Sequence, residues 1–89
     1  MNNLKYVITR LAINDDGDVK TSIVGNQFFD RQSDAIAKMI KVFNITKMEW
    51  EDDVRSSVAD DIDTDDWVCE LYNNDTNEHI TWKVEELKP

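Results

Sequence analysis

The spacing of the apolar residues changes twice along this chain, and this change constrains the fold more than any other feature. Residues 4–13 and 19–28 are rich in β-branched side chains and alternate loosely between apolar and polar, which predicts two strands. Residues 14–18 between them read Asn-Asp-Asp-Gly-Asp, and an Asp-Gly pair favours a tight turn because glycine adopts positive φ easily. The pattern therefore predicts a β-hairpin, with Gly25 as a candidate bulge.

The apolar spacing then becomes helical. Four side chains follow the i, i+3, i+4, i+7 pattern of one helical face: Ile36, Met39, Ile40 and Phe43. Asp30 is a candidate N-cap, so we expect a helix that runs to residue 43 or 44.

A second helix is predicted after the first. Residues 46–49 match a capping box, which places the start of this helix near Lys47. At 100° per residue one apolar stripe follows: Trp50, Val54, Val58 and Ile62.

Two more strands are expected at the end of the chain. In residues 67–72 the side chains of Trp67, Cys69 and Leu71 share one face, and in residues 79–84 alternate side chains are again apolar. The polar residues 73–77 form the turn between them. The sequence thus predicts one α+β domain over residues 1–89, with an antiparallel sheet of about four strands (β-β-α-α-β-β) and its helices on one face.

The net charge of −9 is concentrated in one segment. Residues 49–66 contain nine acidic residues and one arginine, a net charge of −8, whereas residues 1–48 carry a net charge of +2. A chain this acidic is not expected to bind nucleic acid directly or an anionic membrane, because both contacts need Lys and Arg. The excess charge is therefore local.

The sequence gives little support to metal binding or catalysis. Residues 61–65 imitate the start of an EF-hand loop, but Asp66 replaces the required glycine and Tyr72 replaces the bidentate glutamate. His79 is the one histidine, and Cys69 is expected to be a buried small hydrophobe. We therefore expect no enzyme, no cofactor and no metal, with a divalent-cation binder as an alternative. The first six residues lack the apolar core of a signal peptide, so a cytoplasmic protein is expected.

The acidic segment is the candidate binding surface. Like charges one helical turn apart cost a helix about 0.2–0.5 kcal/mol per pair, so folding alone would favour other residues there. A row of carboxylates can enter a Lys/Arg groove that is built for nucleic acid. The candidate partner-binding residues are Glu49, Glu51, Asp52, Asp53, Asp60, Asp61, Asp63, Asp65 and Asp66. A merely solvated face is the alternative interpretation.

Residues 15–18 and 49–66, in a chain of this size and charge, resemble the small acidic inhibitors of phages and mobile elements, including anti-CRISPR proteins. Toxin-neutralising immunity proteins are similar in size and charge. The resemblance implies a non-enzymatic inhibitor that occupies a basic nucleic-acid-binding site on a partner such as a defence nuclease. The second hypothesis is a protein–protein adaptor or assembly domain, in which a sheet face or an edge strand makes the contact and the acidic face only keeps the protein soluble. The sequence does not specify an oligomeric state.

Overall fold

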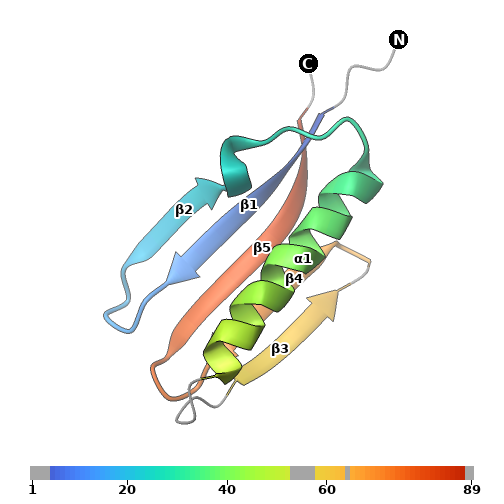
Figure 1. The fold of residues 1–89 in the computed structure, drawn as a ribbon. Helices are drawn as coiled ribbons and strands as arrows, with labels where there is room; N and C mark the ends of the chain where they lie inside the picture. The colour runs from blue at the N-terminus through green and yellow to red at the C-terminus, as the bar shows by residue number, and fades with distance from the viewer. Residues whose placement is uncertain (1–4, 53–57, 64, 88–89) are drawn as a thin grey trace.

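In the described part of the chain, five antiparallel strands form one sheet, and a single long helix lies across one of its faces (Figure 1). The computed structural model describes residues 5–52, 58–63 and 65–87. The strands are β1 (Lys5–Ile13), β2 (Val19–Ile23), β3 (Val58–Asp63), β4 (Val68–Asn73) and β5 (Glu78–Leu87), and the helix is α1 (Gln32–Glu51). Their order in the sheet is β2-β1-β5-β4-β3, and each neighbouring pair is antiparallel. The α+β class is confirmed, with five strands instead of four and one helix instead of two.

The β1–β2 hairpin forms as the turn residues predict. The Asn14 N–H donates to the Asp18 carbonyl over 3.0 Å, and the Asn14 side-chain oxygen accepts from the N–H groups of Asp16 and Asp18. Gly17 adopts φ of +85°, which glycine reaches without the steric cost that other residues incur. The turn is thus fixed by Asn14 and Gly17 together.

The second strand is shorter than predicted. β2 ends at Ile23, and the chain turns through a short 3₁₀ segment, η1 (Val24–Asn26), in which Gly25 has φ of +65°. The chain then returns to β1, where Tyr6 and Phe29 exchange two main-chain hydrogen bonds of 2.8 Å. Gly25 therefore lies in a 3₁₀ turn that ends β2, and not in a β-bulge within the strand.

The prediction of two helices is wrong, because α1 continues through the expected break. The Thr46 hydroxyl donates to the Val42 carbonyl over 3.1 Å, so this side chain bonds back to the preceding turn of the same helix. Neither glycine nor proline lies within α1, so the chain has no residue there that would end it. The residues of the Ser/Thr-x-x-Glu pattern that begins at Thr46 therefore lie inside α1 and do not start a new helix.

The start of α1 also differs from the prediction. Arg31 stands at the N-cap with no side-chain cap, and Asp30 instead forms an ion pair with Lys5 of β1. The hydrogen bond from the Lys5 ammonium lowers the pKa of the Asp30 carboxyl below its usual value. Asp30 thus joins the helix start to β1.

The predicted acidic helix is replaced by the edge strand β3. Val58 and Ile62, which were assigned to a helical stripe, lie on this strand, and Val54 lies outside the described residues. Positions four residues apart share a face in both a helix and a strand, so their spacing does not distinguish the two. Pairing with β4, in the register Asp60–Leu71 and Ile62–Cys69, is what makes this segment extended.

The core lies between α1 and one face of the sheet. Ala35, Met39 and Phe43 are the buried residues of α1, and the ring of Phe43 meets Trp82 edge to face at 5.8 Å. Three strands contribute buried side chains to this core: Ile8 of β1, Cys69 and Leu71 of β4, and Ile80, Trp82 and Val84 of β5, with Phe29 closing one end. The other sheet face has no helix over it in the described chain, and we call it the open face.

Trp67 has an unusual backbone at the start of β4. Its φ is +54°, a left-handed conformation that is costly for a bulky residue, and the strand begins one residue later than predicted. The half-buried Trp67 packs against the core, and its carbonyl accepts from the Val84 N–H over 3.3 Å. Packing and this hydrogen bond therefore hold the conformation in place.

Candidate functional site

The nine predicted acidic residues do not form one helical stripe. Glu49 and Glu51 lie in the last turn of α1 with Asp52 directly after it, Asp60, Asp61 and Asp63 lie on β3, Asp65 and Asp66 lie in the turn before β4, and Asp53 lies outside the described residues. The structure therefore divides the segment between a helix end and an edge strand.

One lysine neutralises part of this group. The Lys47 ammonium lies 3.1 Å from a carboxylate oxygen of Asp60 and 3.8 Å from one of Glu51. The hydrogen bond to Asp60 raises the pKa of Lys47 above its usual value. Asp60 and Ile62 lie on the helix side of β3, so Asp60 belongs to the junction between α1 and β3.

The remaining carboxylates form an exposed group that we call the acidic edge. It consists of Asp61 and Asp63 on the open face of β3 and of Asp65 and Asp66 in the following turn. All four are exposed, and no lysine or arginine within the described residues forms an ion pair with them. The acidic edge therefore presents unneutralised negative charge.

The turn that carries Asp65 and Asp66 is built by Asp63. One carboxylate oxygen of Asp63 accepts from the N–H groups of Asp65 at 2.9 Å and Asp66 at 3.1 Å. Asn73 performs the same task in the β4–β5 turn, where its side-chain oxygen accepts from the N–H groups of two following residues. The acidic edge thus has a defined local geometry.

Glu70 adds to this surface, although it lay outside the predicted segment. It stands directly opposite Asp61 on the neighbouring strand, and its carboxylate accepts from the Tyr72 hydroxyl over 2.7 Å. This hydrogen bond raises the pKa of Tyr72 above its usual value. Since like charges directly opposite each other destabilise a sheet, the Asp61–Glu70 pair costs stability. A sequence signal could identify Glu70 only through the strand register.

The groups considered for chemistry do not converge. Among residues 5–52, 58–63 and 65–87, no three His, Cys, Asp or Glu side chains are placed to hold a metal ion. Cys69 is buried, and this burial raises the pKa of its thiol to about 11. His79 stacks on Tyr72 with ring centroids 4.2 Å apart and contacts the Thr81 hydroxyl.

Among the described residues no helix is long and apolar enough to cross a membrane.

The opposite half of the open face is apolar. Leu11 and Ile13 of β1 lie beside Val19 and Ile23 of β2, and we call these four residues the apolar patch. Val19 is 57% exposed, Ile23 40% and Leu11 36%. The sequence predicted the helical layer on one face of the sheet, but it did not identify that these four apolar side chains lie on the opposite face.

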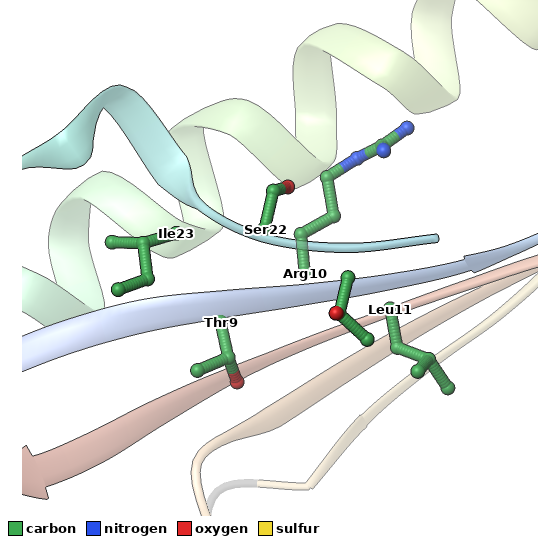
Figure 2. A pocket seen from close by; sticks show the side chains of 6 residues that line it. Thr9, Arg10, Leu11, Ser22 and Ile23 are labelled. Carbon is green, nitrogen blue, oxygen red and sulfur yellow. The ribbon is translucent and has the colours of Figure 1, made fainter. Parts of the chain in front are cut away.

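A solvent-open hollow of about 450 Å³ lies between β1 and β2 at this patch. It is lined by Thr9, Arg10, Leu11, Thr21, Ser22 and Ile23. Figure 2 shows Arg10 and Ser22 pointing toward α1, whereas Thr9 and Leu11 point toward the open face. The hollow is therefore bordered by side chains from both faces of the hairpin, and its lining includes no carboxylate.

Comparison of this chain with known protein families, curated proteins and solved structures finds no match. The interpretation of the site therefore depends on its geometry.

Proposed function

We propose that this protein is a non-enzymatic inhibitory binding protein whose acidic edge occupies a basic nucleic-acid-binding site on a partner such as a defence nuclease, in the manner of anti-CRISPR proteins and nucleic-acid mimics. The observation that carries the proposal is the group of four exposed carboxylates that lack a basic partner among the described residues: Asp61, Asp63, Asp65 and Asp66.

The spacing of these carboxylates suits such a partner. Asp61 and Asp63 are alternate residues on one face of β3, so their positions are about 7 Å apart along the strand. That separation is similar in scale to neighbouring phosphates on a nucleic-acid strand. A groove of lysines and arginines that accepts phosphates can therefore accept these side chains, with electrostatic steering that speeds their encounter.

The cost of the charges to folding also supports a binding role. Asp61 and Glu70 stand opposite each other as like charges, although an opposite charge at either position would stabilise the sheet. Selection for stability alone would not retain this pair, whereas selection for a negative surface would.

The test compares two pairs of turn carboxylates. Asp65→Lys/Asp66→Lys and Asp15→Lys/Asp16→Lys both change the net charge from −9 to −5, and all four side chains are exposed. Each pair follows a residue whose side-chain oxygen accepts turn N–H groups, so the two variants perturb folding similarly. The probe is a panel of purified RNA-guided and restriction nucleases, each with a labelled DNA substrate, and the readout is retention of that DNA on the nuclease.

We expect the protein to displace DNA from at least one nuclease, and we expect the Asp65/Asp66 variant to do so at least about tenfold more weakly. The Asp15/Asp16 variant should retain the activity, and displacement should weaken as salt rises. Full displacement by the Asp65/Asp66 variant, or no displacement from any nuclease, would contradict the proposal.

The adaptor hypothesis has its own support in the exposed side chains of Leu11, Val19 and Ile23. Adjacent exposed apolar side chains are typical of protein-interaction surfaces. A contact through this patch would be nearly insensitive to salt, so a salt titration of any complex separates the two functions.

A further inference from the structure

We infer that β2 is a self-association edge, which pairs antiparallel with β2 of a second copy of this chain and extends the sheet across a two-fold axis at Thr21. This inference does not depend on the proposed function. It rests on the main-chain geometry of β2, on the order of its side chains and on the charge of the two sheet edges.

The free side of β2 has main-chain groups available for pairing. The Asn14 N–H donates to the Asp18 carbonyl, and the register of the hairpin continues without a bulge to Thr9 and Ile23. Because alternate residues of a strand direct their N–H and C=O groups to opposite sides, Lys20 and Ser22 bond to β1. Val19, Thr21 and Ile23 therefore direct their main-chain groups to the outer edge, where no other strand of the described residues pairs with β2.

The side chains of β2 read almost the same in both directions. An antiparallel pair centred on Thr21 places Val19 opposite Ile23 of the second copy, Thr21 opposite Thr21, and Lys20 opposite Ser22. The first two are apolar and Thr–Thr pairs, which stabilise antiparallel sheets, and no like charges face each other. In this register Val19, Thr21 and Ile23, whose main-chain groups face outward, stand opposite one another across the two copies, so side chains and hydrogen bonds favour the same alignment. A shift centred on Lys20 would instead bring the two lysines together.

The opposite edge has the features that prevent such pairing. β3 carries Asp60, Asp61 and Asp63, and a second copy of β3 beside it would bring these carboxylates together. Charged residues on edge strands are a common protection against edge-to-edge association. β2 carries one charged residue, Lys20, and all five of its residues are exposed.

The two-fold arrangement also explains the apolar patch. Pairing through β2 places the two patches side by side at the centre of a ten-stranded sheet, with both helices on the same face and an acidic edge at each end. Val19 of the second copy meets Ile23 beside the hollow, so apolar area that is exposed in one copy becomes covered. A two-fold interface closes after two copies, whereas β2 on β3 would continue into a polymer.

The first experiment measures the mass of the full chain by sedimentation velocity over a range of concentrations. We expect a concentration-dependent dimer. Thr21→Lys should raise its dissociation constant at least about tenfold, because two lysines then meet at the axis. Ala59→Lys places the same side chain on the open face of β3 and is the matched control, which should leave the dimer unchanged.

The second experiment tests the register by cross-linking. In this alignment the Cα atoms of the two Thr21 residues are about 5.5 Å apart, within the range of a disulfide. Thr21→Cys should therefore form a covalent dimer on oxidation, whereas the two Val19 positions are about 13 Å or more apart along the strand, so Val19→Cys should not. The wild-type thiol, Cys69, is buried. The inference would be overturned if the chain stayed monomeric at all concentrations or formed a polymer. It would also be overturned if Ala59→Lys dissociated the dimer, or if Thr21→Cys and Val19→Cys cross-linked equally.

Discussion

The two edge strands of this sheet differ in charge, in packing and in what their exposure implies. β3 lies beside α1, to which the Lys47–Asp60 ion pair joins it, whereas β2 lies away from the helix (Figure 1). Three side chains of β3 are carboxylates, and those of β2 are mainly β-branched. The three carboxylates of β3 make it a poor template for another strand, whereas β2, whose one charged residue is Lys20, is a better template. The comparison teaches that one small sheet can present two surfaces with opposite binding chemistry.

The largest expected effect comes from the strand between the two halves. Trp82 of β5 is buried against Phe43, and β5 pairs with both β1 and β4. Trp82→Ala should therefore lower the free energy of unfolding by about 3–5 kcal/mol, measured by urea denaturation. Amide exchange should show both edges losing protection together. A hairpin of β1 and β2 that stays protected in this variant would mean that the two halves fold separately.

A smaller loss of stability is expected at alkaline pH, and it arises from Cys69 in the β3–β4 half of the sheet. Burial raises the pKa of Cys69 to about 11 in the folded protein, whereas the unfolded thiol has its ordinary value. As the pH rises, the thiol therefore loses its proton in the unfolded state first, which stabilises that state. The free energy of unfolding should thus be highest below about pH 9 and should fall by on the order of 2 kcal/mol between about pH 9 and about pH 11. Urea denaturation of the wild type and of Cys69→Ala over this pH range tests the prediction. Parallel curves for the two proteins would contradict it.

Charge reversal at Asp61 should give a small gain in stability. Asp61→Lys converts the like-charge pair with Glu70 into an opposite-charge pair, so the free energy of unfolding should rise by about 0.5 kcal/mol. Thr21→Lys is the matched control on the other edge, since Thr21 stands opposite Leu11, and it should leave the stability of the monomer unchanged. Measurements at low protein concentration separate this effect from association. A loss of stability in Asp61→Lys would mean that the Asp61–Glu70 pair does not oppose folding.

The smallest effect is expected from acid, and it arises at the other end of the sheet. The Lys5 ammonium lowers the pKa of Asp30, so the ion pair contributes stability above the ordinary pKa of an aspartate and loses it as the pH falls through the lowered value. The difference in stability between the wild type and Asp30→Asn should shrink as the pH is lowered from about 6 to about 2. Asp15→Asn, at an exposed turn position, is the control. A difference that is constant with pH would argue against the Lys5–Asp30 pair.

Local sequence signals predicted the parts of the fold that depend on neighbouring residues. Asn14 and Gly17 specify the first turn within five residues, and Asn73 specifies the last, so both hairpins could be predicted. The helix face around Met39 and Phe43 was predicted for the same reason, because its apolar spacing fits only one period.

The errors lie where a distant partner decides the structure. Val58 and Ile62 fit a helix and a strand equally, and β4, which follows later in the chain, makes them extended. The place of Glu70 beside the acidic edge depends on that same register. The predicted helix is therefore wrong for residues 58–63, which form β3, whereas Glu49 and Glu51 lie on α1, and the binding role of these carboxylates stays a prediction.

Trp67 gives this surface an optical property. Trp67 directly follows Asp65 and Asp66 in the sequence, and its half-buried side chain packs against the core. Binding of a partner to these carboxylates would remove water near this ring and change its fluorescence emission. Trp67 is therefore an intrinsic fluorophore next to the acidic edge, and its emission adds to that of Trp50 and Trp82.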